Sequence, residues 1–167
     1  MNNQKLYEAI LNKTLNFLAY SQRSRKEVVD RINTYLYKKN LLTTEKEEIK
    51  VKIMEEVDNL KLLDDKVYAK MYVEGKIRSK KPVSKRKLTE FLYKKGIGRG
   101  IIEETLSTYN KNDERELIKD LITKKLRSIK DTDSRVIKRK LASYILGKGF
   151  APEQVFEELE KHFNKSS

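Results

Sequence analysis

Apolar side chains recur along the chain at intervals of three and four residues, the spacing that places them on one face of an α-helix. In segment 4–20 this face consists of Leu6, Ile10, Leu11, Phe17 and Leu18. Eight further stripes of the same kind follow, the last of them at residues 152–163. Five of their predicted buried faces are Val28, Val29, Ile32, Tyr35 and Leu36; Ile49, Ile53, Val57 and Leu60; Leu88, Phe91 and Leu92; Val136, Ile137, Leu141, Tyr144 and Ile145; and Val155, Phe156, Leu159 and Phe163. No alternating apolar run is long enough to predict a strand. The pattern therefore predicts about nine helices and an all-α fold.

Short polar motifs mark where several of these helices begin. Ser24 and Glu27 have the spacing of a capping box, in which the serine hydroxyl accepts the N–H of the third helical residue and the glutamate reaches back. Thr44 and Glu47 have the same spacing before the third apolar stripe. We therefore predict that the second and third helices start at these two motifs.

Two adjacent acids, Asp64 and Asp65, stand where the fourth helix should begin. We expect Asp64 to cap free backbone N–H groups and Asp65 to face the positive end of the helix dipole. Adjacent carboxylates can also form a catalytic or metal site, but at a helix start they are more often caps. The helix that follows is expected to bury one apolar face, which consists of Val67, Tyr68, Met71, Tyr72 and Gly75.

Glycines mark the ends of two later helices. Gly96 and Gly149 each follow a lysine after an apolar stripe, so we predict that both are left-handed caps. The endings at 35–40, 91–96 and 144–149 resemble one another: each has an aromatic residue first, an aliphatic residue second and a lysine fifth.

The repeated endings divide the nine predicted helices into three groups of three. The groups span residues 4–63, 64–112 and 113–164. A period of roughly 50 to 60 residues is typical of stacked helical repeats that pack mainly on their neighbours. We predict an elongated, curved array of three tandem three-helix repeats.

The polar positions are strongly basic. The chain of 167 residues has 38 lysines and arginines against 25 acids, a net charge of +13. Residues 64–112 hold 13 of the basic residues and 6 of the acids, and no acid interrupts the tract from Lys76 to Lys87. Such a chain repels itself unless its usual partner is anionic, either nucleic acid or an acidic protein surface.

We predict that this basic region contacts the partner, although a solvated helix end and turn is the simpler interpretation. The predicted contact residues are Lys76, Arg78, Lys80, Lys81, Lys85, Arg86, Lys87, Lys94, Lys95, Arg99, Lys138 and Arg139. Tyr37 and Tyr93 lie beside lysines and could stack on bases or fill a protein pocket. Because exposed charges contribute little to stability, we expect five Glu substitutions at positions 80, 81, 85, 86 and 87 to leave the melting temperature nearly unchanged.

Several classes of protein are excluded or disfavoured by what the sequence lacks. It has no cysteine, and its one histidine, His162, lies near the C-terminus, where we expect it at the surface. It has no nucleophile motif, no metal-spaced carboxylate cluster and no phosphate-binding loop. We therefore predict no catalytic site, no metal and no cofactor. No apolar run approaches a membrane span or a secretory signal, so we predict a cytoplasmic protein without membrane contact, and a monomer.

Four segments together resemble one known family. They are 23–28, Arg-Ser-Arg-Lys-Glu-Val; 62–73, which opens Leu-Leu-Asp-Asp and continues with Tyr68-Ala69; and the endings 95–97 and 148–150. On these motifs, of which Leu-Leu-Asp-Asp-x-x-Tyr-Ala is the most specific, residues 7–163 resemble the RecX family of bacterial regulators of the RecA recombinase. Asn40 departs from the glycine common after the first middle helix, and that helix looks about one turn longer. Members from Gram-positive bacteria often carry a fourth repeat.

The resemblance implies a negative regulator of recombination, DNA repair and the SOS response. Such a protein would lie in the groove of the RecA nucleoprotein filament and suppress ATP hydrolysis, co-protease activity and strand exchange. Its partners would be the RecA filament and single- or double-stranded DNA, bound weakly and in a salt-dependent way.

Two alternatives from other classes stay open. A stand-alone basic helical regulator could read duplex DNA by itself, with two of the predicted helices paired as a helix-turn-helix. Glu103 and Glu104 argue against it, because acids do not suit a helix beside phosphates. The chain could also be a scaffold that binds an acidic protein unrelated to recombination.

Overall fold

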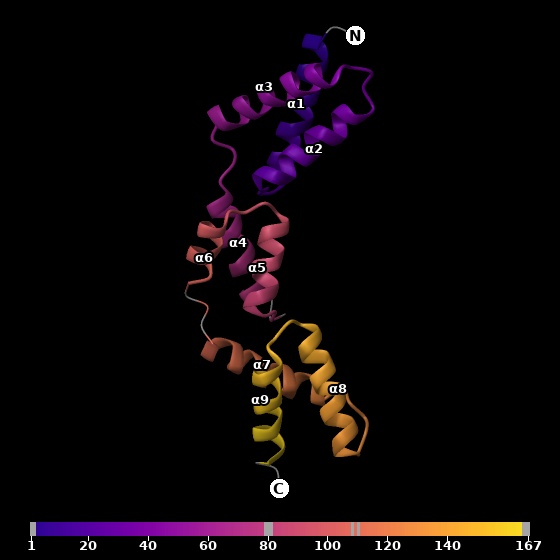
Figure 1. Ribbon diagram of the computed structural model, residues 1–167, viewed down its shortest axis with the longest axis vertical. Helices are drawn as coiled ribbons and strands as arrows, with labels where there is room; N and C mark the ends of the chain where they lie inside the picture. The colour runs from indigo at the N-terminus through magenta and orange to yellow at the C-terminus, as the bar shows by residue number, and fades with distance from the viewer. Residues whose placement is uncertain (1–2, 79–81, 108, 110, 165–167) are drawn as a thin grey trace. The chain divides into compact units, whose positions relative to one another are not determined.

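The chain is all-α in a computed structural model that describes residues 3–78, 82–107, 109 and 111–164, without the side chains of 111–113. No strand occurs in these ranges, which confirms the predicted fold class. Figure 1 labels the nine helices found there: α1 (Asn3–Tyr20), α2 (Arg25–Tyr37), α3 (Thr43–Asn59), α4 (Asp65–Arg78), α5 (Lys85–Lys94), α6 (Arg99–Thr105), α7 (Lys111–Leu126), α8 (Ser134–Gly147) and α9 (Pro152–Asn164).

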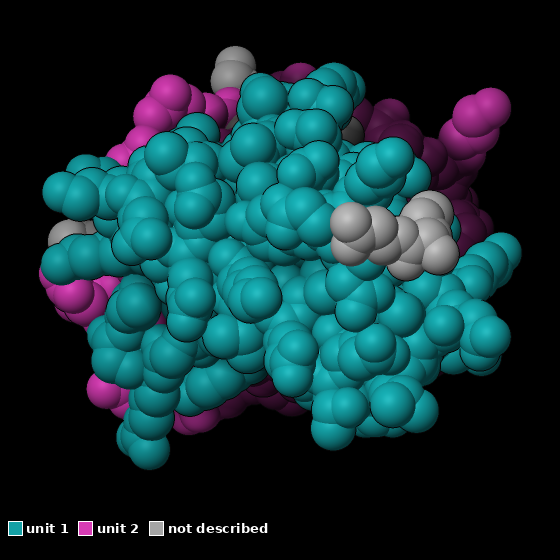
Figure 2. All heavy atoms as spheres, turned by 90° about the horizontal axis from the view of Figure 1, so that it is seen from above, with its two compact units in different colours: residues 1–71, 93–101 teal, residues 72–92, 102–167 magenta. Residues whose placement is uncertain are grey.

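The helices pack into two compact units, which Figure 2 shows in two colours. The first unit contains residues 1–71 and 93–101, and the second contains 72–92 and 102–167. The division passes through α4, α5 and α6, so the middle group of helices contributes to both units. The predicted repeat boundaries at 63/64 and 112/113 stay a prediction.

The core of the first unit is formed by the predicted faces of α1, α2 and α3. Its buried residues are Leu6, Ile10, Val28, Ile32, Leu36, Ile49, Ile53, Met54 and Val57. Leu60 was expected on the α3 face, but α3 ends at Asn59 and the Leu60 side chain is half exposed. Since burying one aliphatic side chain contributes about 1.5 to 3 kcal/mol, this cluster supplies much of the stability of the unit.

The core of the second unit is built mainly from α7, α8 and α9. Its buried residues are Ile118, Leu121, Ile122, Leu141, Ala142, Ile145, Phe150, Val155 and Leu159. The expectation that Phe156 is buried is wrong, because its side chain is 52% exposed. Glu158 is buried in its place, and its carboxylate lies 3.1 Å from Lys161 Nζ. A long side chain can cover core with its stem while its charged end finds a partner.

The predicted buried face of α4 is only partly correct, because Tyr68 and Tyr72 are half-buried but its other members are exposed. Ala69 and Val73 are buried, whereas Val67 and Met71 are 43% and 56% exposed. The half-buried ring of Tyr72 stacks on Phe91 with centroids 3.9 Å apart. Because α4 carries apolar residues on two of its sides, spacing alone could not show which side faces the core.

The start of α3 differs from the predicted capping box as well. The helix begins at Thr43, and Glu45 rather than Glu47 accepts the N–H of Leu42, at 2.9 Å. The Glu47 carboxylate instead pairs with Lys50 one turn later. A glutamate three residues after the cap can accept a free N–H whatever the cap residue is, so the same kind of bond forms although the helix starts two residues earlier than predicted.

Candidate partner-binding surface

The predicted basic tract begins in the last turn of α4. Arg78 forms an ion pair with Glu74, with 2.7 Å between Nη2 and the carboxylate. Lys76 Nζ lies 5.4 Å from the centre of the Tyr72 ring. Lys80 and Lys81 lie outside the described residues. The two described cations of the tract on α4, Lys76 and Arg78, therefore already have neighbours on their own helix.

Two cations at the start of α5 bind the end of another helix. Arg86 Nε donates to the Gly149 carbonyl at 3.4 Å, and Lys87 Nζ donates to the Gly147 carbonyl at 2.6 Å. The last carbonyls of a helix have no partner within it, and positive charge is favourable there. These two side chains therefore stabilise the end of α8, a role that the sequence interpretation missed.

Lys85 makes two further contacts in the second unit. Its backbone N–H donates to the Glu114 carboxylate at 2.8 Å, and its Nζ donates to the Tyr109 carbonyl at 3.1 Å. The Tyr109 hydroxyl in turn donates to the Val83 carbonyl at 2.9 Å. The N-terminus of α5 is thus joined by polar contacts to α7 and to the segment that precedes it.

Reversing the charge of Lys85, Arg86 and Lys87 together is expected to destabilise the protein. The structure contradicts the premise that these cations only face solvent, because each donates to a backbone carbonyl. Glutamates there would lose these bonds and repel the carbonyls, so we expect the free energy of unfolding in urea to fall by about 1 to 3 kcal/mol.

Lys94→Glu is the matched control for this charge reversal. Lys94 is an exposed cation at the end of the same helix. Its reversal removes a favourable charge from the last turn of α5 but no hydrogen bond to a carbonyl of another element, so the free energy of unfolding should change by less than about 1 kcal/mol. Equal effects of the triple variant and the control would show that the three carbonyl contacts do not stabilise the fold.

The same arrangement recurs in the first unit at the start of α2. The Ser24 hydroxyl accepts the N–H of Glu27 at 3.2 Å, and the Ser24 N–H donates to the Glu27 carboxylate at 3.1 Å. The backbone N–H of Arg25 donates to Asp65 at 2.8 Å, as that of Lys85 does to Glu114. An acid from the start of a later helix thus receives the first N–H of both α2 and α5.

The two acids at the start of α4 have separate roles. Asp64 Oδ1 accepts the N–H groups of Lys66 and Val67 at 2.9 and 3.0 Å. Asp65 lies in the first turn of α4 but binds the Arg25 N–H on α2. Both carboxylates are used in packing, and neither belongs to a group of three or more potential metal ligands among the described residues.

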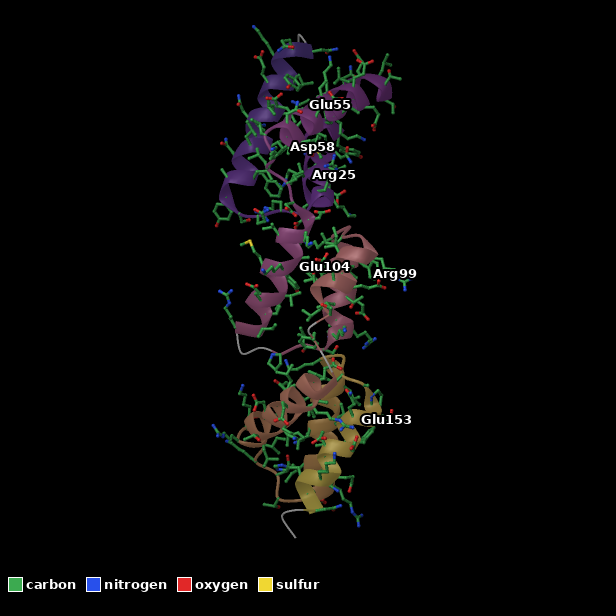
Figure 3. All side chains as sticks on the ribbon, turned by 90° about the vertical axis from the view of Figure 1, so that its left-hand side faces the viewer. Arg25, Glu55, Asp58, Arg99, Glu104 and Glu153 are labelled. Atoms are coloured by element: carbon green, nitrogen blue, oxygen red, sulfur yellow. The ribbon has the colours of Figure 1, made fainter. Side chains whose placement is uncertain are left out.

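Arg25, which Figure 3 labels together with Asp58, also forms a bidentate ion pair with this residue at the end of α3. The two nitrogen–oxygen distances are 2.7 and 2.6 Å. The hydrogen bond from the guanidinium lowers the pKa of Asp58 below its ordinary range. This pair helps to fix the start of α2 against α3 in the first unit.

Lys95, predicted to contact the partner, is paired inside the first unit. Its Nζ lies 2.5 Å from the Glu27 carboxylate. Burial alone would raise the pKa of Glu27, but hydrogen bonds from Lys95, the Ser24 N–H and Tyr68 lower it below its ordinary value. The ionised form of Glu27 is therefore favoured in the folded protein.

This lowered pKa predicts a loss of stability in acid. A carboxyl group whose pKa is depressed by folding contributes fully above its unfolded value, near pH 4.3 for glutamate, and the contribution disappears as the pH falls through the folded pKa. Urea unfolding measured from pH 6 to about pH 3 should therefore show a smaller acid loss in Glu27→Gln than in the wild-type protein. Glu48→Gln, at an exposed position of α3, should keep the wild-type profile. Identical profiles for the two variants would contradict the role of Glu27.

The remaining predicted cations lie apart from these contacts. Lys94, Arg99 and Arg139 are exposed, and Figure 3 labels Arg99 at the start of α6. Lys138 Nζ lies 3.1 Å from Glu160 and 5.1 Å from the centre of the Phe163 ring. The structure thus brings Arg86 and Lys87 together at the end of α8, while Lys138 is directed towards α9.

A hollow of about 660 Å³ lies beside the basic tract in the second unit. It is lined mainly by apolar side chains, among them Val73, Ile77, Val83 and Leu117, with Lys76 and Lys124 also present. Its walls come from α4, α5, α6 and α7 and from the segments before α5 and after α6, so no single stretch of sequence could reveal it. None of the described helices is long and apolar enough to cross a membrane.

Two family models match the chain. The model described as "RecX, second three-helix domain" matches residues 64–106, and "RecX, third three-helix domain" matches residues 113–159. Together these matches cover more than half of the chain, including α4 to α6 and most of α7 to α9.

Curated relatives give the same result. "Regulatory protein RecX" of Clostridium acetobutylicum is 34% identical over 160 residues, which cover 81% of this chain and 73% of that protein. "Regulatory protein RecX" of Chlorobium phaeobacteroides is 30% identical over 149 residues, which cover 89% of this chain and 90% of that protein.

Solved structures share the fold. A crystal structure of regulatory protein RecX aligns with a TM-score of 0.72 and 23% identity, over 95% of this chain and 73% of that one. The crystal structure of RecX from Lactobacillus salivarius aligns with a TM-score of 0.67 and 24% identity, over 95% and 97% of the two chains. These matches support an all-α array of three-helix domains.

Proposed function

Because the chain belongs to the RecX family of regulatory proteins, we propose that it is a negative regulator of RecA-dependent recombination and DNA repair. In this proposal it binds in the groove of the RecA nucleoprotein filament and suppresses ATP hydrolysis, co-protease activity and strand exchange. The 34% identity over 160 residues with regulatory protein RecX of Clostridium acetobutylicum is the observation that carries the proposal.

Polar contacts between successive groups of helices support a clamping role. The Lys95–Glu27 pair and the Lys87–Gly147 bond each join residues at least 60 positions apart in the sequence. Within each unit such contacts can keep weak binding surfaces at a fixed spacing, and their contributions then combine through effective concentration. If the chain binds one arrangement of adjacent RecA protomers better than another, it slows every step that needs the other arrangement, by no more than the difference in affinity.

Exposed cations can supply the contacts with acidic protein surface or DNA phosphate. Lys94 on α5 and Arg139 on α8 are exposed and can reach an anionic partner. Arg86 and Lys87 bind carbonyls of the chain itself, so we propose that their main role is to stabilise the fold and that any contact with the partner is secondary. Contacts with phosphate would make DNA binding weak and strongly dependent on salt.

The ATPase activity of RecA on single-stranded DNA tests this proposal. Adding the chain at less than one molecule per RecA protomer is expected to lower the steady-state rate, since one bound molecule would restrain several protomers. If the ADP produced is measured through a coupled enzyme assay, a control reaction that starts from added ADP, without RecA, checks that the chain does not inhibit the coupling enzymes. An unchanged ATPase rate at a molar excess of the chain would refute the proposal.

The alternative to a regulator of RecA is a stand-alone regulator that reads duplex DNA, and the two functions can be distinguished. The helix α6, which would be the second of a helix-turn-helix pair with α5, has seven residues, and Glu103 and Glu104 on it are exposed. Two acids beside phosphates oppose binding. Binding to several duplexes of different sequence decides between the two functions: a filament regulator should show no preference, whereas a duplex reader should favour one sequence.

A further inference from the structure

A second hollow in the second unit lies outside every site predicted from the sequence. Its volume is about 630 Å³, and it is lined by residues from the end of α7, the segment after it and the middle of α8. Three lysines and one aromatic ring dominate its walls: Lys125, Lys130, Lys140 and Tyr144. The apolar hollow near Lys76 lacks this combination of cations and an accessible ring.

Tyr144 gives the hollow an accessible aromatic surface. Its side chain is 37% exposed, although it stands on α8 directly before the buried Ile145. Lys125 Nζ lies 5.3 Å from the ring centre and Lys148 Nζ lies 4.9 Å from it. Two lysines from different elements thus converge on one ring, and lysine side chains are long enough to move aside without disturbing the backbone.

The charge of the hollow favours an anion. Asp131 is the one acid among its described lining residues, and it is paired with Lys140. Lys125, Lys130 and the neighbouring Lys148 are left to give the site a positive charge around the ring. The Ser143 hydroxyl also lines the hollow and can donate to a phosphate oxygen.

We propose that this hollow binds one nucleotide of a single-stranded nucleic acid, with the base stacked on Tyr144 and the flanking phosphates held by Lys125, Lys130 and Lys148. Cationic grooves with an exposed aromatic ring are the usual way in which proteins bind single strands without reading their sequence. In a duplex the bases are stacked on one another and cannot reach the ring. An acidic protein segment could use the lysines but would not depend on the ring. The site does not depend on whether the chain slows RecA.

The test is the binding of a fluorescent oligothymidylate of about ten nucleotides, measured by anisotropy at several salt concentrations. Tyr144→Leu should weaken binding about 5- to 100-fold, the range expected for losing one stacked base, without changing the salt dependence. Tyr144→Phe keeps the ring and should bind like the wild-type protein. Lys125→Gln should weaken binding and reduce the slope of log K against log salt by about 0.7, the value for one phosphate on a single strand.

Tyr20→Leu is the matched control, because Tyr20 is an 87% exposed tyrosine at the end of α1, far from the hollow in the sequence. It should leave binding unchanged. A strand of the same length without bases provides a second arm that needs no variant: the wild-type protein should bind it as weakly as Tyr144→Leu binds oligothymidylate. Equal binding of the two strands by the wild-type protein would overturn the proposal.

Two competitors separate the strand from other anions. Free thymidine monophosphate carries the same base and phosphate, and polyglutamate carries comparable negative charge without a base. Neither should displace the strand when thymidine monophosphate is added at the same concentration of nucleotides as the strand, or polyglutamate at the same concentration of negative charges. Displacement by the mononucleotide would make the ligand a free nucleotide, and displacement by polyglutamate would make it an acidic protein; either result would overturn the proposal.

Discussion

Replacing Leu92 by alanine is expected to lower the free energy of unfolding by about 2 to 5 kcal/mol, the range for a buried leucine whose removal leaves a cavity. The Leu92 side chain is 0% exposed. It lies on α5, a helix of ten residues in which only Leu88 and Leu92 are buried. A short helix that loses one of two anchors cannot recover the lost contacts by shifting. Urea unfolding followed by circular dichroism measures the change.

Tyr93→Ala is the control for this prediction. Tyr93 is the next residue on the same helix and is 49% exposed, so its replacement removes few buried atoms, and alanine has the higher helix propensity. We expect a change of less than about 1 kcal/mol for Tyr93→Ala. If Leu92→Ala cost less than about 0.5 kcal/mol, the assignment of Leu92 to the core would be wrong.

The middle helices of the predicted groups could be identified from the sequence with their buried faces. In α2 the predicted face included Val28, Ile32 and Leu36, and all three are buried. In α5 and α8 the predicted residues Leu88, Leu92, Leu141 and Ile145 are buried as well, whereas Tyr144, predicted on the same face of α8, is 37% exposed. These helices carry charged residues on the side opposite the apolar stripe, so periodicity alone determines which side faces inward.

Periodicity failed where a helix has apolar residues on more than one side. On α4 it favoured Val67 and Met71, while the structure buries Ala69 and Val73. On α9 it included Phe156, which is exposed, and it could not anticipate the buried Glu158. Which side of such a helix is covered depends on the neighbouring helices, and that information is not local.

The roles of the cations could not be predicted for the same reason. A run of lysines and arginines is expected to face solvent unless something distant in the sequence supplies a partner. Lys87 finds that partner in a carbonyl 60 residues away, and Lys95 finds it in Glu27, 68 residues away. One signal was nevertheless present: Ser24 and Ser84 stand four residues before the first buried position of α2 and α5, Val28 and Leu88. Their equal placement indicates that the starts of α2 and α5 make the same kind of contact with a later part of the chain.

The glycines that follow α5 and α8 pack against the starts of α2 and α5. Gly96 has φ of 78° and Gly149 has φ of 88°, the left-handed conformation in which residues with a Cβ are strained. A Cβ on Gly96 would lie 2.7 Å from the Cβ of Lys26, at the start of α2. A Cβ on Gly149 would lie 2.7 Å from Ser84 Oγ and from Lys87 Cγ, at the start of α5. In the first unit, therefore, the end of α5 packs against the start of α2, and in the second unit the end of α8 packs against the start of α5.

Gly96→Ala is accordingly expected to lower the free energy of unfolding by about 2 to 4 kcal/mol, from the left-handed backbone and from crowding of a packed contact. Gly149→Ala should have a comparable cost, because the buried Ser84 hydroxyl accepts the Lys87 N–H and the Lys87 side chain holds the Gly147 carbonyl, so moving either group away from the new Cβ would break a hydrogen bond. Gly75→Ala is the matched control: nothing lies within 4 Å of a Cβ there, and alanine should be neutral or stabilise α4 by up to about 1 kcal/mol. Urea unfolding of the three variants gives the order. If Gly96→Ala and Gly75→Ala had the same effect, the close contact between the end of α5 and the start of α2 would not contribute to stability.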